Sequence, residues 1–157
     1  MSKKQNLYLG KAGEFAIISE FLCRGLNVAI PEVDVGDDVF VVRDDSGEYL
    51  RVQVKTATGS EQKAHVKAQF RLSLRQLATP FTPELVYVFV VRMNEKWLPF
   101  VLIPRYQLYE MLVTELPTDA PKAYTLNLTF APTRCFSGKL DLTPYINNFE
   151  KFPTIFH

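Results

Sequence analysis

The chain has 157 residues, of which 47% are hydrophobic, so it is long enough to bury a sizeable core as one globular domain. Its aromatic content of 13% argues against a disordered chain. The net charge of +1 excludes a global field that would draw the protein onto nucleic acid or acidic lipid, so a nucleic-acid site must be a local patch.

Targeting and metal-binding signals are sparse. The first ten residues lack the apolar core of a signal peptide, and the longest apolar runs, such as 85–91, are too short to span a bilayer. We therefore expect a cytoplasmic protein with no membrane partner. The isolated Cys23 and Cys135 are expected to be free, buried thiols. Because only His65 and His157 are available, a His-based zinc site or a Ser-His-Asp triad is poorly supported.

Periodicity and turn residues predict the order of the elements. A helix over 7–24 ends at Gly25 and is followed by a short strand over 27–30. A β-hairpin then has strands over 39–42 and 49–54, and a mobile loop is expected over 58–64. The later segments are expected to be a strand over 65–74, a turn or short helix over 75–84, a buried strand over 85–92 paired with 97–104, a helix over 105–116 and a strand over 123–130. This order predicts an α/β or α+β sheet protein with one helix packed early on the sheet.

One face of the second hairpin strand is polar. Because residues two apart in a strand share a face, Arg51, Gln53 and Lys55 point one way, whereas Val52 and Val54 point the other way. A surface hairpin with a solvated polar end would show the same residues, so the strand alone does not distinguish a site from such an end.

Antiparallel pairing brings an aspartate to this polar face. With the turn centred in 44–47, Asp38 lies opposite Gln53, at a Cβ separation of about 5 Å, and shares its surface with Lys55. Asp37 then faces away. A shift of the register by one residue would exchange the two aspartates, and we favour Asp38 because it directly abuts the apolar strand.

The first predicted helix carries a carboxylate within its apolar stripe. At about 100° per residue, Ile17, Ile18 and Phe21 lie within about 60° of Glu14, and Leu22 within about 80°. A carboxylate on a buried face needs a partner or a cation, although an acid near a helix start is also a common partner of the helix dipole. The oxygens of Glu14 and of the hairpin aspartate and amide would suit a hard cation such as Mg²⁺, and the lysine beside them could orient a water or stabilise developing negative charge.

The stretch GKAGEFAIISEFLCRGLNVAIPEVDVGDD, followed by YLRVQVKT, resembles the PD-(D/E)XK nuclease superfamily, and in particular a bacterial branch with Q-x-K in place of (D/E)-x-K. The resemblance covers about residues 10–57. It implies a restriction-endonuclease-like α/β fold, with a mixed central sheet, flanking helices and an αβββαβ core. It also implies one nuclease-like domain over 1–157, with a core over about 7–115 and a C-terminal extension over about 116–157.

The resemblance also implies roles for individual residues. Glu14 matches the acid of the first helix, Asp38 the aspartate of the motif, Gln53 the position of the second acid and Lys55 the motif lysine. Asp38, Gln53, the carbonyl of Val54 and Glu14 would then hold Mg²⁺, with Mn²⁺ as an alternative. Gln53 departs from the common pattern, because an amide brings an oxygen but no charge, and the proline that usually precedes the aspartate is absent. Asp34 occupies the place of an extra acid in that branch, or only caps the turn.

A basic segment follows the motif. Residues 51–75 contain six positive side chains and one acid, Glu61. Five of the positive residues are the expected nucleic-acid contacts: Arg51, Lys63, Lys67, Arg71 and Arg75. A strand edge protected by lysines would look similar. The resemblance implies a metal-dependent endonuclease acting on DNA, with RNA as an alternative substrate. Cutting both strands of a duplex often requires a dimer, which favours a homodimer. The rival interpretation is a catalytically weak or inactive nuclease-like module that binds nucleic acid.

Overall fold

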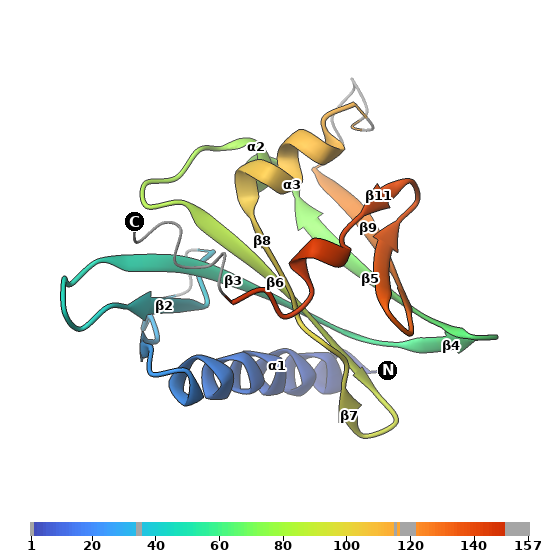
Figure 1. Cartoon of the computed structure of the whole chain (residues 1–157), viewed down its shortest axis with the longest axis horizontal. Helices are drawn as coiled ribbons and strands as arrows, with labels where there is room; N and C mark the ends of the chain where they lie inside the picture. The colour runs from blue at the N-terminus through green and yellow to red at the C-terminus, as the bar shows by residue number, and fades with distance from the viewer. Residues whose placement is uncertain (1, 34–35, 115, 117–121, 150–157) are drawn as a thin grey trace.

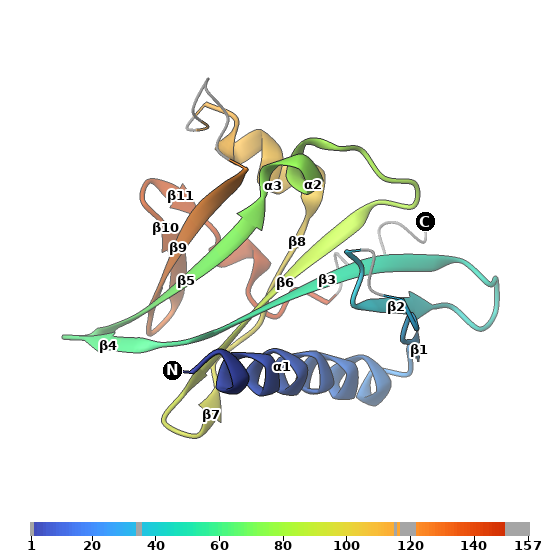
Figure 2. The ribbon, with the colours of Figure 1, turned by 180° about the vertical axis from the view of Figure 1, so that it is seen from behind.

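The computed structural model describes residues 2–33, 36–114, 116 and 122–149. The strands form two sheets, and the long helix α1 (Lys3–Cys23) lies along one of them (Figures 1 and 2). The shorter helices are α2 (Leu74–Ala78), α3 (Arg105–Leu112) and the 3-10 turn η1 (Thr143–Tyr145). Within the described part of the chain, no helix is long and apolar enough to cross a membrane.

The first sheet is mixed. Its order is β1-β2-β3-β6-β7, with β8 also paired to β6. Strand β3 runs parallel to β6, and the other pairs are antiparallel. The strands are β1 (Asn27–Ala29), β2 (Val39–Val42), β3 (Tyr49–Thr58), β6 (Leu85–Met93), β7 (Lys96–Trp97) and β8 (Val101–Pro104).

The second sheet is antiparallel and has the order β11-β10-β9-β5-β4. Its strands are β4 (Ser60–Gln62), β5 (His65–Ser73), β9 (Ala123–Ala131), β10 (Arg134–Ser137) and β11 (Leu140–Asp141). Only one residue separates β3 from β4, so the chain passes directly from the first sheet into the second (Figure 1).

Strand β6 explains why both faces of the first sheet are covered. Its residues 85–91 are all buried, as expected for an unbroken apolar run in the centre of a sheet. Val86, Val88 and Val90 pack in the cluster that contains Ile17 and Phe21 of α1. The intervening residues of β6 pack in a second cluster with inward-facing residues of β5 and β9: Leu85, Tyr87, Phe89, Val91, Phe70, Leu72, Leu126 and Leu128. The two hydrophobic clusters therefore place α1 and the second sheet on opposite faces of β6.

Most of the expected elements are confirmed, and the differences have local causes. Helix α1 begins at Lys3 instead of Leu7, because Ser2 and Gln5 form a reciprocal capping box. The expectation of a loop over 58–64 is wrong for residues 60–62, which form β4 and pair with the start of β5. Leu22 is exposed, outside the apolar stripe. Both cysteines are free as expected, but only Cys135 is buried.

Helix α1 approaches β3 most closely where a glycine faces a threonine. A Cβ added at Gly13 would lie 2.0 Å from Oγ1 and 2.9 Å from Cβ of Thr56. Both distances are below van der Waals contact, so only glycine permits this spacing. Since Glu14 is the next residue, the close approach also fixes how near the helical carboxylate lies to β3.

The first prediction concerns this helix–strand contact. Gly13→Ala is expected to lower the free energy of unfolding by about 1–3 kcal/mol, because overpacking pushes α1 away from β3. Urea denaturation measures the loss. Gly10→Ala is the matched control, because a Cβ there meets nothing within 4 Å. Adding Thr56→Gly to Gly13→Ala should recover part of the loss, and purely additive effects of the two substitutions would contradict the contact.

Candidate active site

Asp38 is fixed against the edge of β3. Its backbone N–H donates to the carbonyl of Val52 at 2.9 Å, and its Oδ2 accepts from the backbone N–H of Val54 at 2.6 Å. The same Oδ2 accepts from Nε2 of Gln53. The pairing of Val39 with Val52 continues the register that places Asp38 opposite Gln53, as expected. The structure therefore brings Asp38, Gln53 and Val54 into direct contact.

Asp37 has a different environment from its neighbour. Its carboxylate is 2% exposed and accepts from Nη2 of Arg51 at 2.6 Å and from Nε at 3.1 Å. The Arg51 guanidinium also lies over the ring of Phe81, at 4.5 Å from its centroid. Asp37 is therefore a buried ion-pair partner, and it largely neutralises the charge of Arg51, which makes this arginine a poorer phosphate contact than expected.

A directional chain of hydrogen bonds holds the Gln53 side chain. Tyr87 Oη donates to Gln76 Oε1 at 2.9 Å, and Gln76 Nε2 donates to Gln53 Oε1 at 3.0 Å. Burial raises the pKa of the Tyr87 hydroxyl, so this group keeps its proton and remains a donor. The chain turns the Gln53 oxygen toward Gln76 and the Gln53 NH₂ group toward Asp38.

Gly36 leaves space for the Gln76 side chain in this chain of hydrogen bonds, because glycine has no Cβ. The Gly36 carbonyl accepts a second hydrogen bond from Gln76 Nε2 at 2.7 Å. Its φ is +102°, and a Cβ at this position would lie 2.9 Å from Gln76 Nε2. Sequence reasoning missed Gln76 and Tyr87, because they lie 23 and 34 residues beyond Gln53 and carry no motif. The glycine beside the aspartates was the one local signal of a close backbone approach.

Lys55 and Gln53 border the same cavity. It has a volume of about 650 Å³, and its other lining residues include Ser73, Arg75 and Gln76 from the end of β5 and from α2. Lys55 is partly buried, whereas Arg75 is exposed. The structure thus places the predicted motif lysine and one predicted nucleic-acid contact around a single cavity beside Asp38.

The other predicted site residues lie on α1, on β5 and in the turn that precedes β5. Glu14 is 16% exposed and pairs with Lys11 on its own helix, next to the contact between Gly13 and Thr56. Lys67 and Arg71 are outward-facing on β5, and Lys63 occupies the turn between β4 and β5 with φ of +57°. The predicted position Asp34 lies outside the described residues.

A hard cation such as Mg²⁺ needs several oxygen ligands, and the residues around Asp38 offer some of them. Within residues 2–33, 36–114, 116 and 122–149, no group of three or more His, Cys, Asp or Glu side chains could hold a metal ion. Asp38, the Gln53 amide and the Val54 carbonyl provide oxygens, which suit a Mg²⁺ ion that keeps several of its waters. The fit requires one change: the Gln53 amide must rotate, because its NH₂ group rather than its oxygen faces Asp38.

Comparisons with known proteins identify the fold. No family model and no curated protein matches the chain. A solved bacterial homing endonuclease is similar over 98% of this chain and 92% of its own, with 18% sequence identity and a TM-score of 0.58. The Holliday junction resolvase Hjc of the archaeon Archaeoglobus fulgidus covers 74% of this chain and 82% of its own, with 12% identity and a TM-score of 0.43. The homing endonuclease confirms the expected restriction-endonuclease-like fold, in which β4 and β5 are inserted between β3 and α2 of the αβββαβ core.

The second prediction separates the two aspartates. Asp37→Ala is expected to lower the free energy of unfolding by about 1–3 kcal/mol, since it leaves the partly buried Arg51 without its carboxylate. Asp38→Asn keeps an oxygen for the Val54 N–H and should change stability less, but it should abolish Mn²⁺ binding measured by calorimetry. Loss of Mn²⁺ binding in a folded Asp37→Ala protein would contradict the assignment of Asp37 to the ion pair and of Asp38 to the cation.

The third prediction tests the orientation of the Gln53 amide. Gln76→Glu keeps the acceptor for Tyr87 but removes the donor to both the Gly36 carbonyl and Gln53. Gln53 can bond to the new carboxylate only with its NH₂ group. The Gln53 oxygen then turns toward Asp38. Because a hydrogen bond to a charged group is worth about 1 kcal/mol more than a neutral one, Mn²⁺ affinity should rise about five- to tenfold in calorimetry. Thr79→Glu adds the same charge to the same cavity, at a residue whose side chain bonds to the Arg75 carbonyl and not to Gln53, and an equal gain there would show that charge alone is responsible.

Proposed function

We propose that this protein is a divalent-metal-dependent nuclease that hydrolyses phosphodiester bonds in DNA as an endonuclease. The observation that carries the proposal is the carboxylate of Asp38, hydrogen-bonded to Gln53 and Val54 on β3, beside a cavity that Lys55 also lines. The fold alone would not support it, because structures at this level of identity share architecture without necessarily sharing chemistry.

Three oxygen donors would hold the cation. These are the Asp38 carboxylate, the Gln53 amide after rotation and the Val54 carbonyl, with Glu14 supporting the site from α1. Mg²⁺ is the proposed ion, and Mn²⁺ is the alternative. Such an ion, when bound, polarises a phosphoryl oxygen and lowers the pKa of a bound water.

The charged side chains of the cavity would act on the substrate. Lys55 would orient the attacking water or stabilise the negative charge that develops on the phosphoryl oxygens. Arg75, across the same cavity, would bind the phosphate that is attacked or its neighbour. Lys63, Lys67 and Arg71 would neutralise phosphates farther along the strand, and we assign Arg51 to holding Asp37.

The Gln53 orientation favours one alternative. An amide that presents its NH₂ group to Asp38 stabilises the carboxylate by hydrogen bonding in the absence of a cation. A protein fixed in this arrangement would bind nucleic acid through its basic residues without cutting it. DNA affinity without divalent-ion binding would support this second candidate.

The fourth prediction tests the nuclease directly. Wild-type protein should cleave supercoiled plasmid or branched DNA with Mg²⁺ or Mn²⁺ and should stop when the ion is chelated. Lys55→Ala should reduce cleavage at least about 100-fold, within the range expected for loss of a positioned acid–base or electrostatic group, while DNA binding in a gel-shift assay changes little.

Two comparisons make this test specific. Lys96→Ala removes an exposed lysine at the start of β7 and should leave cleavage unchanged. Equal cleavage by Lys55→Ala would contradict its assigned role. Cleavage of an RNA substrate alone would replace DNA as the substrate, and binding of DNA without cleavage under any ion would favour the binding module.

A further inference from the structure

The outward face of the second sheet carries a regular row of polar side chains, of which only Lys67 and Arg71 have a role in the proposed function, as phosphate contacts. Along β5, exposed and buried residues alternate, so that His65, Lys67, Gln69, Arg71 and Ser73 share the exposed face. The inward residues between them belong to the core. The sheet partners of Lys67, Gln69 and Arg71 on β9 are Thr129, Asn127 and Thr125, of which Asn127 and Thr125 are exposed on the same face and Thr129 is buried.

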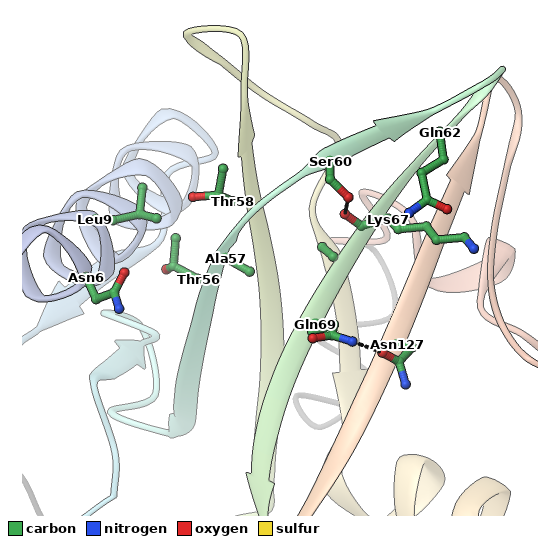
Figure 3. Close-up of a pocket in the computed structure, with 11 residues that line it drawn as sticks. Asn6, Leu9, Thr56, Ala57, Thr58, Ser60, Gln62, Lys67, Gln69 and Asn127 are labelled. Atoms are coloured by element: carbon green, nitrogen blue, oxygen red, sulfur yellow. Dashed lines mark hydrogen bonds between the residues drawn. The ribbon is translucent and has the colours of Figure 1, made fainter. Parts of the chain in front are cut away.

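Two amide side chains lie at the centre of this face. Nε2 of Gln69 donates to Oδ1 of Asn127 at 2.8 Å, and both residues are exposed. They border a cavity of about 730 Å³ between α1 and the two sheets. In Figure 3, Asn6 and Leu9 of α1 lie on one side of this cavity, and Gln69 and Asn127 lie on the other.

We propose that this face reads the bases of duplex DNA in the major groove, with Gln69 and Asn127 as the side chains that contact base edges. The inference deepens the proposed nuclease function, because it names a substrate with a preferred sequence. Amide side chains can bond both the donor and the acceptor that adenine presents in the major groove. The hydrogen bond between Gln69 and Asn127 fixes the direction of both amides before DNA arrives.

The dimensions favour the major groove. At Gln69 and Arg71 the sheet is a two-stranded ribbon, because β4 pairs only with residues 65–67 of β5 and β10 pairs only with residues 129–131 of β9. A two-stranded ribbon fits the major groove, which is about 12 Å wide, whereas the minor groove is about 6 Å wide. From Lys67 to Ser73 the strand advances about 20 Å, close to the length of six base-pair steps.

The charges around the face suit a phosphate backbone, and the lack of aromatic side chains beside the amides favours duplex DNA over a single strand. Lys67 and Arg71 flank the amides on β5, and Lys3 lies one helical turn before Asn6 on the other side of the cavity. Proteins that hold single strands stack the bases on aromatic side chains. On the fully described strands β5 and β9, the outward positions from Lys67 to Ser73 and from Ala123 to Thr129 carry no aromatic residue, and the ring pair of His65 and Phe136 lies at the end of the face, beyond the two amides.

The same face joins the candidate active site. Ser73, at the end of the outward row on β5, lines the cavity that contains Gln53 and Lys55. On β3, Lys55 borders that cavity, and Ala57, two residues farther along on the same face, borders the cavity next to Gln69. A duplex laid along β5 would therefore pass from the amide pair to the proposed cleavage centre.

The test is a selection from a pool of randomised duplex DNA, carried out with chelator so that the result does not depend on cleavage. Wild-type protein should enrich a sequence motif. The double variant Gln69→Ala/Asn127→Ala should lose the preference at one or more positions of that motif and bind the selected duplex about 5- to 150-fold more weakly. Lys67→Ala should instead weaken all sequences alike and lower the salt dependence by about one phosphate contact.

The same selection includes a control variant and has defined outcomes that would overturn the proposed base contacts. Gln107→Ala removes an amide from α3 and should leave the motif unchanged. Absence of a motif from wild-type protein that binds the pool, a motif unaltered in the double variant, or no binding of duplex at all would each overturn the proposal. A change in oligomeric state of the double variant without a change in motif would identify the face as a protein interface and would also overturn it. The proposed nuclease function is tested separately, by metal-dependent cleavage that the wild type shows and Lys55→Ala loses.

Discussion

The hydrogen bonds that tie Asp38 to the edge of β3 are the constraint on which the proposed chemistry depends. Two hydrogen bonds with backbone N–H donors, from Asp38 N–H to the Val52 carbonyl and from Val54 N–H to Asp38 Oδ2, place the carboxylate just before the start of β2, beside the part of β3 that pairs with β6. The position is rigid because β3 is held by two strands and packed beneath α1. A carboxylate positioned by backbone bonds needs little rearrangement to act, which is the general advantage of a preorganised site.

The amide at Gln53 gives this site a second state. In the present arrangement, the hydrogen-bond chain from Tyr87 through Gln76 directs the Gln53 NH₂ group at Asp38, and the carboxylate is stabilised without a cation. A cation would require the opposite orientation of the amide. The free energy of ion binding must therefore exceed that of the hydrogen bonds that are lost, each worth about 0.5–1.5 kcal/mol when neutral and more with a charged partner. This competition links metal affinity to Gln76, a residue of α2.

Local pattern was enough to predict much of this architecture. The apolar run at 85–91 indicated a buried strand, and the turn at 44–47 determined the register that places Asp38 opposite Gln53. The pattern could not predict that Asp37 would be buried against Arg51, because that ion pair depends on how the chain enters β2. Nor could it predict the contact of Gln69 with Asn127, which are 58 residues apart and meet only because β9 pairs with β5. Interactions set by tertiary pairing carry no signal in a single sequence.

The central claim is that a divalent cation binds at Asp38. It is tested most directly by growing crystals with Mn²⁺ and locating the ion by its anomalous scattering. The account predicts a peak within coordination distance of the Asp38 carboxylate and the Val54 carbonyl, with the Gln53 oxygen turned toward it and away from Gln76. A Mn²⁺ peak elsewhere, or no peak together with an unchanged bond from Gln53 to Asp38, would contradict it.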